Sequence, residues 1–283
     1  ALPEVGRRSG SGRALRVCTA ARAQDELAAA ANAGARILFS IEPGYPAALA
    51  FLDGAPPMLY AKGRAELLGG SIVSVVGSRQ SSAAGVQLAR QFAAGLGAAG
   101  VVVASGLARG IDAAAHQAAL ATGTVGVLAG GIDVVYPPEH RTLQAEVGER
   151  GCLIAEQPLG FQPRAQDFPR RNRIISGIAR AVVVIEAARR SGSLITARLA
   201  AEQGREVFAV PGHPLDPRAE GTNRLLKDGA TMATGAEDVL TVLSAQSPVE
   251  PGLRAAHLPR PDPGLSEVAA PVRLDEQETA EAI

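Results

Sequence analysis

Six short segments with almost no polar residues recur through the middle of this chain, and stretches with helical spacing separate them. A strand that is apolar on both faces is buried on both sides, which is typical of a parallel sheet covered by helices. Alternating strands and helices connect through right-handed crossovers. We therefore expect an α/β fold built on a doubly wound, mostly parallel sheet. The expected strands are residues 72–76, 101–104, 125–128, 153–155, 181–185 and 207–210.

Three parts of the chain differ in composition. Residues 1–62 predict a small helical region, because the alanine-rich stretch 20–33 favours a helix, with a short strand near 37–41. Residues 63–245 hold the strand–helix alternation and predict the main domain. Residues 246–283 are rich in proline and lack periodicity, which is typical of a linker or tail.

The bulk composition limits the classes of function. The chain has 28 basic and 28 acidic residues, and this zero net charge argues against diffuse binding of a polyanion over the whole surface. Its two cysteines, Cys18 and Cys152, lie far apart without metal-ligand spacing, so we expect a reducing, cytoplasmic location. No apolar run approaches the roughly 20 residues that span a membrane, and the first residues lack the apolar region of a secretory signal, so no membrane partner is expected.

The segment from Arg164 to Arg198 concentrates positive charge against this neutral background. It holds eight arginines and two acidic residues, Asp167 and Glu186. Within it, the sequence FPRRNR at 168–173 places an aromatic ring beside three arginines and an amide. Arginine matches phosphate as a bidentate fork, and a ring can stack on a base. The segment therefore predicts a nucleic-acid-binding face, and the alternative is a solvated loop whose arginines pair with acids elsewhere.

Glycine-rich turns follow five of the six expected strands. The first turn, GSRQSS at 77–82, combines a glycine that allows close backbone approach, hydroxyl groups, Arg79 and a following helix N-terminus. Together these features favour a phosphate. The alternative is an ordinary turn in which Ser81 or Ser82 caps the helix.

The second turn, SGLARGID at 105–112, adds a further cation. Arg109 either points into the same crevice as Arg79 or pairs with Asp112. Asp112 falls in the first turn of a helix, where a carboxylate suits the helix dipole, so we expect a capping role for it.

Two later turns offer further groups. The turn after the third strand contains a glycine pair, and we expect Asp133 and Tyr136 to shape that turn rather than to line a pocket. After the fifth strand, Ser191, Gly192 and Ser193 begin a helix and supply N–H groups and hydroxyls for an anion. Because the carboxyl ends of parallel strands meet at one edge, these turns together predict a site for a phosphate-rich ligand.

Several enzyme motifs are missing from the sequence. It lacks the GxxxxGK[ST] loop of P-loop hydrolases, the GxGxxG dinucleotide fingerprint and the GxSxG nucleophile elbow. Its histidines are scattered without metal-ligand spacing. We therefore expect no metal, no cofactor and no catalytic residues. The histidines are His116, His140, His213 and His257.

Six stretches of the sequence together resemble the DprA/Smf family, the DNA-processing proteins of natural transformation. Each stretch alone is unspecific, but the joint match is specific and extends across the expected main domain. The stretches are VVGSR (75–79), SGLARGID (105–112), GGIDVVYPPEH (130–140), DFPRRNRIISG (167–177), EAARRSGSLITARLAAEQGREVFAVPG (186–212) and GTNRLLKDGA (221–230).

The resemblance implies an extended Rossmann-like domain that binds single-stranded DNA without strong sequence preference. Members of the family protect incoming strands, load RecA onto them, act as homodimers and have no established catalytic activity. The family's phosphate site falls on Gly77, Ser78 and Arg79, and its base contact falls on Phe168. Its basic residue shortly before that ring falls on Arg164.

Charge and position add further candidates for contact with the nucleic acid. They lie in the turn after the second strand, beside Phe168 and at the helix start after the fifth strand. These candidates are Arg109, Arg170, Arg171, Asn172, Arg173, Ser191, Gly192 and Ser193.

The chain also departs from the family pattern. Residues 1–62 match only the end of a sterile-alpha-motif-like helical domain plus a connector, and residues 246–283 do not match a winged-helix domain. Two enzyme classes remain as alternatives. One is a nucleotide-processing hydrolase similar to the "lonely guy" phosphoribohydrolases, whose PGGxGTxxE sequence this chain lacks. The other is a nicotinamide-dependent oxidoreductase, which the missing GxGxxG disfavours.

Overall fold

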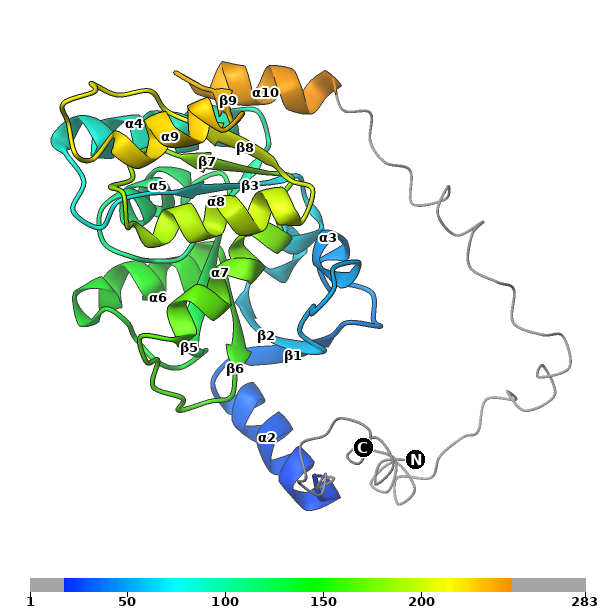
Figure 1. Cartoon of the computed structure of the whole chain (residues 1–283). Coiled ribbons are helices and arrows are strands. Elements are labelled where there is room, and N and C mark those ends of the chain that lie inside the picture. The colour runs from blue at the N-terminus through cyan, green and yellow to red at the C-terminus, as the bar shows by residue number, and fades with distance from the viewer. Residues whose placement is uncertain (1–17, 246–283) are drawn as a thin grey trace, which may run out of the picture. The chain divides into compact units, whose positions relative to one another are not determined.

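The computed structural model describes residues 18–245, which fold around a mixed β-sheet in the order β1-β2-β6-β5-β4-β3-β7-β8-β9 (Figure 1). Strands β1 and β2 are antiparallel, as are β2 and β6, and all other neighbours are parallel. The strands are β1 (Ala35–Phe39), β2 (Met58–Gly63), β3 (Ile72–Val76), β4 (Val102–Ser105), β5 (Thr124–Gly131), β6 (Cys152–Gln157), β7 (Ala181–Val184), β8 (Glu206–Ala209) and β9 (Thr231–Met232).

Helices connect most of these strands. The α-helices are α2 (Ala20–Asn32), α3 (Ala47–Ala50), α4 (Ala83–Ala98), α5 (Ile111–Ala119), α6 (Arg141–Arg150), α7 (Asp167–Gly177), α8 (Gly192–Glu202), α9 (Glu220–Lys227) and α10 (Ala236–Ala245). Two 3₁₀ turns, η1 (Ala65–Gly69) and η2 (Pro138–His140), complete the described elements. The sheet belongs to a compact unit that begins at Ala30, and most of α2 lies outside that unit.

The order of the strands creates a switch point beside β3. The chain runs from β3 through β4 and β5 to β6 on one side, and then returns to the other side of β3 as β7, β8 and β9. Ser74 of β3 lies opposite Ala104 of β4 and also opposite Val182 of β7. Doubly wound sheets bind ligands at the carboxyl ends of the strands that flank such a point.

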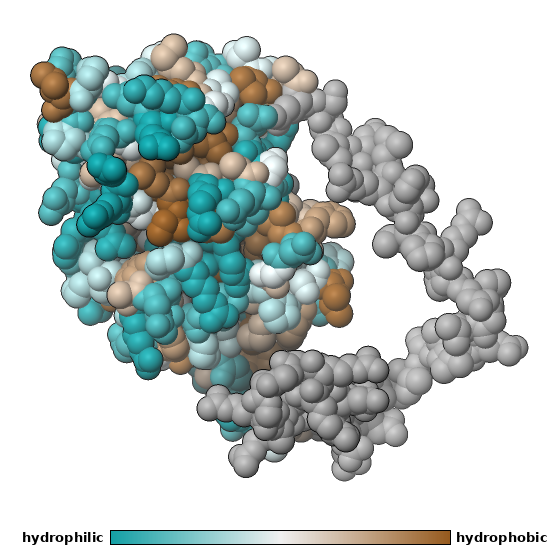
Figure 2. Space-filling model, viewed as in Figure 1, coloured by the Kyte–Doolittle hydropathy of each residue, from teal (hydrophilic) through white to brown (hydrophobic). Residues whose placement is uncertain are grey.

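Alternate residues of the central strands enter cores on opposite faces of the sheet. Val73 and Val75 belong to the apolar cluster that includes residues of α4 and α5. Ile72 and Val76 belong to the cluster that includes residues of α7 and α8. Burial on both faces explains why these strands are almost continuously apolar. On the face shown in Figure 2, hydrophilic side chains predominate and hydrophobic ones form small patches.

The expected fold class is confirmed, and all six strands predicted from apolar runs are present with ends shifted by a few residues. The sheet extends beyond the expected range 63–245, however. Residues 35–63 supply β1 and β2, and β2 pairs with β6. The strand expected near 37–41 is present as β1, but β2 was not predicted and neither strand was assigned to the sheet. The reason is that they pair antiparallel and are joined by a proline-rich connection without a crossover helix. The expectations for residues 1–17 and 246–283 lie outside the described residues.

Candidate nucleic-acid interface

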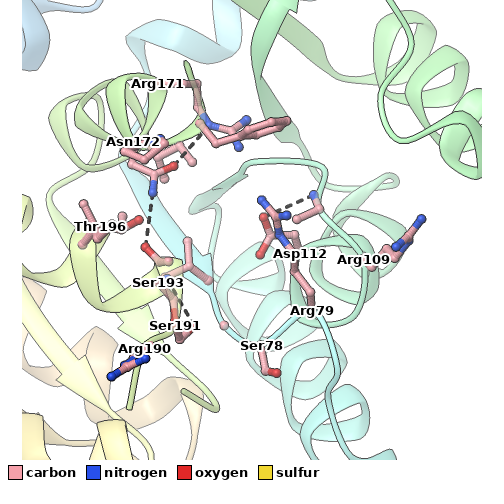
Figure 3. Close-up of a pocket in the computed structure, with 18 of the residues that line it drawn as sticks. Ser78, Arg79, Arg109, Asp112, Arg171, Asn172, Arg190, Ser191, Ser193 and Thr196 are labelled. Atoms are coloured by element: carbon pink, nitrogen blue, oxygen red, sulfur yellow. Dashed lines mark hydrogen bonds between the residues drawn. The ribbon is translucent and has the colours of Figure 1, made fainter. Parts of the chain in front are cut away.

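A cavity of about 800 Å³ opens at the switch point of the sheet. The turns after β3 and β7 line it, together with the first turns of α7 and α8. In Figure 3, Ser191, Ser193 and Thr196 face Ser78 and Arg79 across the cavity. Arg171 and Asn172 of α7 lie at one end of it. The topology therefore brings together turns that lie far apart in the sequence.

Phe168 lies between a cation and a second aromatic ring at this cavity. The guanidinium carbon of Arg79 is 5.2 Å from the centroid of the Phe168 ring. On another side, the centroid of the Tyr136 ring is 4.9 Å from that of Phe168, with the planes tilted by 47°. Cation–π and ring–ring contacts hold the ring in place. The expectation that Tyr136 only shapes its turn is wrong, because Tyr136 lines the cavity and is 42% exposed.

The sequence FPRRNR forms the first turns of α7 rather than a solvated loop. The Asp167 carboxylate accepts a hydrogen bond of 2.8 Å from the N–H of Arg164 as the helix begins. Pro169 falls in the first turn, where its missing N–H costs no helical hydrogen bond. Because the segment is helical, its arginines point in different directions and have different surroundings.

Arg171 lines the cavity, but its side chain is buried and hydrogen-bonded to the backbone. Its side chain is 6% exposed, and Nη1 donates to the carbonyl oxygen of Gly106 at 3.0 Å and to that of Val127. Burial lowers the pKa of Arg171 to about 10, and the nearby Asp112 carboxylate acts in the opposite direction. The guanidinium therefore binds the turn after β4 and the middle of β5, and it contributes positive charge to the cavity from within.

The expectation that Asp112 caps its helix is wrong, because Asp112 lies in the first turn of α5 but its carboxylate binds N–H groups of the preceding turn. Its Oδ2 accepts hydrogen bonds from the N–H groups of Gly106 at 3.1 Å and Ala108 at 3.3 Å. Burial raises the pKa of Asp112, while the Arg171 charge and the backbone hydrogen bonds lower it. Arg109 does not pair with Asp112. It forms an ion pair with Glu139 and lines the cavity with its side chain 61% exposed.

The N-terminus of α4 holds a carboxylate of the chain itself. Ser82 caps the helix by accepting a hydrogen bond of 2.9 Å from the N–H of Gly85. Glu186 accepts a hydrogen bond of 2.9 Å from the Ser82 N–H and one of 2.5 Å from its hydroxyl. An internal anion therefore lies where the 77–82 turn predicted a phosphate. From this turn, Ser78 and Arg79 remain available at the cavity.

Gly77 is required by packing. A Cβ atom at this position would lie 2.6 Å from Cγ1 of Ile111 and 3.1 Å from the carbonyl oxygen of Glu186. The same holds for the glycine pair after the third strand. The N–H of Gly131 donates to the carbonyl oxygen of Phe161, so that pair accommodates the chain before α7. In both turns, the close approach that glycine allows is made by the protein itself.

The helix start expected near Ser191 is confirmed as the N-terminus of α8. The Ser191 Oγ accepts a hydrogen bond of 3.3 Å from the N–H of Ser193, and the two hydroxyl oxygens are 2.7 Å apart. Nδ2 of Asn172 donates to the carbonyl oxygen of Gly192 at 3.3 Å and thereby links α7 to α8. All four of these residues line the cavity.

Three of the expected arginines do not line the cavity. Nη2 of Arg170 lies 3.4 Å from Oε1 of Glu156, and Nη2 of Arg173 lies 2.5 Å from the same oxygen. Arg164 is exposed in the turn before α7. The interpretation of arginines that pair with acids elsewhere therefore holds for Arg170 and Arg173.

Among the cavity residues that the sequence analysis missed, two lie on or next to α8. Thr196 follows Ser193 by three residues on α8, and helical spacing could have placed both on one face. Arg190 lines the cavity, whereas its neighbour Arg189 lies 3.8 Å from Glu220. Nothing in the sequence tells these two arginines apart.

The described part of the chain holds no group of three or more His, Cys, Asp or Glu side chains that could bind a metal ion. Within the same residues, no helix combines the length and the apolar character needed to cross a membrane.

Comparison with known proteins identifies relatives along most of this region. Residues 36–244 match the family described as DNA recombination-mediator protein A. Protein Smf of Escherichia coli (strain K12) is 46% identical over 199 residues, which cover 69% of this chain and 53% of that protein. DNA processing protein DprA of Streptococcus pneumoniae is 44% identical over 198 residues, covering 69% of this chain and 70% of the relative. The chain thus spans about half the length of the Escherichia coli protein.

Solved structures agree with these matches. The X-ray structure of Streptococcus pneumoniae DprA has a TM-score of 0.77 at 36% identity, covering 85% of this chain and 86% of that one. A structure of DNA processing protein A from Helicobacter pylori, which concerns its single-stranded DNA binding mode, has a TM-score of 0.68 at 28% identity. It covers 75% of this chain and 96% of the relative.

Proposed function

Since this chain belongs to the DNA recombination-mediator protein A (DprA/Smf) family, we propose that it binds single-stranded DNA in the cavity at the switch point and acts without catalysis. The observation that carries the proposal is the contact of the exposed Arg79 guanidinium with the Phe168 ring, 5.2 Å away, at the cavity. A strand of DNA offers both a phosphate for the cation and a base for the ring. Single-stranded DNA binding by the Helicobacter pylori relative supports the same assignment.

The character of the cavity supports a binding role. Among the described residues, Asp112 is the only carboxylate that lines it, and its Oδ2 is engaged by two backbone N–H groups. Glu139 lies nearby but pairs with Arg109. Neither group is placed to serve as a free general acid or base, which disfavours the nucleotide-hydrolase alternative.

We further propose the cellular role from family membership. The protein protects incoming single strands and loads RecA onto them during natural transformation or homologous recombination, and it works as a homodimer. Two copies would join two binding sites on one strand and raise the overall affinity without new contacts.

Fluorescence anisotropy with a labelled oligo-dT and a matched duplex, over a salt series, tests the binding proposal. We expect preference for the single strand. If about 3–5 phosphates are neutralised, log K falls against log salt with a slope of roughly −2 to −3.5. Arg79→Ala should weaken binding and flatten the slope, whereas Arg198→Ala, which removes an exposed arginine paired with Glu202 outside the cavity, should not. Absence of binding at low salt would refute the proposal, and release of base from nucleoside monophosphates would favour the hydrolase.

A further inference from the structure

The wall of the cavity formed by α8 contains a hydroxyl without a protein partner, on a side chain that is otherwise buried. Thr196 is 2% exposed, lines the cavity and directs its oxygen into it in Figure 3. Within residues 18–245, its hydroxyl has no hydrogen-bond partner. This oxygen is not among the described buried atoms that lack a partner, so it is the part of the otherwise buried side chain that a ligand in the cavity can reach.

The other buried serine and threonine hydroxyls of the described residues all have partners. Each lies within hydrogen-bond distance of a backbone carbonyl or of a second hydroxyl, as is usual for buried serine and threonine. The pairs are Ser74 with Ile175, Ser105 with Val75, Thr124 with Val103, Ser176 with Asn172, Thr222 with Ala219, and Ser193 with Ser191. Thr196 is the exception, and it is the one of the seven that combines a free hydroxyl with a place on the cavity wall.

The surroundings of Thr196 favour an anion. At the start of α8, the N–H of Ser193 donates to the Ser191 hydroxyl and that of Leu194 to the Ser191 carbonyl oxygen. Within residues 18–245 this leaves the N–H of Gly192 without a partner, and the helix dipole adds partial positive charge there. Arg190, immediately before the capping Ser191, is exposed at the cavity and forms no ion pair within residues 18–245. Asp112 on the facing wall is the one carboxylate among the described lining residues, and its Oδ2 is already engaged by backbone N–H groups.

We propose that Thr196, Arg190 and the N-terminus of α8 form a second phosphate subsite, opposite the Arg79–Phe168 subsite. Resting on the proposed function, this inference adds that a strand of DNA passes between the two walls and is held at a phosphate on each. The Thr196 hydroxyl donates a hydrogen bond to a phosphate oxygen, and Arg190 supplies the charge. The cation over the Phe168 ring is Arg79 and not Arg190, so we place this phosphate apart from the one beside the stacked base.

Two pairs of variants separate this role from a structural one. Thr196→Val removes the hydroxyl and keeps the shape, and because that hydroxyl has no protein partner, the substitution should not lower the free energy of unfolding. It should weaken binding of labelled oligo-dT about 10-fold, as expected for a lost hydrogen bond to a charged group. Thr196→Ser retains the hydroxyl and should restore most of the affinity.

The consecutive arginines provide a matched charge pair. Arg190→Gln should weaken binding and reduce the salt slope by about 0.7, which corresponds to one phosphate contact on a single strand. Arg189→Gln, which removes the same charge from a side chain paired with Glu220 outside the cavity, should leave the slope unchanged. Comparing oligo-dT with a 5′-phosphate and with a 5′-hydroxyl distinguishes binding of a terminal phosphate from binding of an internal one. A loss of affinity in Thr196→Val for either oligonucleotide supports the subsite.

The subsite is refuted if Thr196→Val and Arg190→Gln both bind with wild-type affinity while Arg79→Ala is impaired. That result would leave the proposed function intact. If the wild-type protein itself does not bind oligo-dT, the proposed function fails instead. Equal losses in Arg189→Gln and Arg190→Gln would also refute the subsite, because they would show a general charge effect.

Discussion

Removal of the aromatic ring at position 168 should weaken single-strand binding without changing its dependence on salt. Phe168 is half-buried, and its ring contacts the guanidinium of Arg79 and the ring of Tyr136. Phe168→Leu keeps an apolar side chain of similar reach at the start of α7, so the helix should remain folded. It deletes the π face that can stack on a base and that holds the Arg79 cation.

The expected loss of affinity follows from the removal of one stacking ring. Stacking of one base on an aromatic side chain contributes roughly 1–3 kcal/mol, which is a loss of about 5- to 150-fold in affinity. Loss of the cation–π contact frees the Arg79 side chain and adds at most about 0.5–1 kcal/mol for a group so exposed. Because Phe168 carries no charge, the number of phosphates neutralised stays the same.

The assay is a titration of labelled oligo-dT at several salt concentrations, with unfolding followed in parallel. Phe168→Leu should shift the whole plot of log K against log salt downward at an unchanged slope. Phe51→Leu is the matched control, because Phe51 is 86% exposed and does not line the cavity. Wild-type affinity in a folded Phe168→Leu protein, or an equal loss in Phe51→Leu, would refute the reasoning.

Two further predictions concern stability. Burial lowers the pKa of His116 to about 3, below its unfolded value near 6.5, so the unfolded chain binds the extra proton first. The free energy of unfolding therefore decreases as pH falls below about 6.5, by about 2 kcal/mol at pH 5. Denaturation of His116→Gln, followed over the same pH range, should show a flatter dependence on pH. A dependence identical to that of the wild type would contradict the buried, neutral state of His116. Gly77→Ala should lower the free energy of unfolding by about 1–3 kcal/mol, because its Cβ would lie 2.6 Å from Ile111; unchanged urea denaturation would show that Ile111 moves aside at little cost.

The fold could be predicted from the sequence wherever a strand is buried on both faces. Strands β3 and β7 are almost purely apolar, and their alternation with helices predicted both the parallel sheet and its ligand-binding edge. Strands β1 and β2 could not be assigned to that sheet. They pair antiparallel at its edge, and the proline-rich segment between them carries no periodic pattern that identifies a partner.

The candidate site was predictable as a place but not as a set of contacts. Arg79 and Phe168 were predicted as site residues from their residue types and from their positions near buried strands, and both line the cavity. Arg170 and Arg173 form ion pairs with Glu156 and do not line the cavity. Glu156 lies outside the arginine-rich segment and becomes their neighbour only when α7 packs near β6.

The local charge excess overstated the number of arginines free to bind a ligand, for the same reason. Acids close in space but outside the counted segment pair with several of its arginines, as Glu156 and Glu220 do. Ion pairing between elements is decided by three-dimensional packing, which a count along the chain does not contain.

Photocrosslinking with an oligo-dT that carries 5-iodouracil, followed by mass spectrometry of the crosslinked peptides, tests the central claim most directly. This base reacts preferentially with an aromatic ring on which it stacks. If single-stranded DNA lies in the cavity, the crosslink will map to Phe168 or Tyr136 and will disappear in Phe168→Leu or Arg79→Ala. A crosslink that maps away from the cavity and persists in both variants would contradict the account.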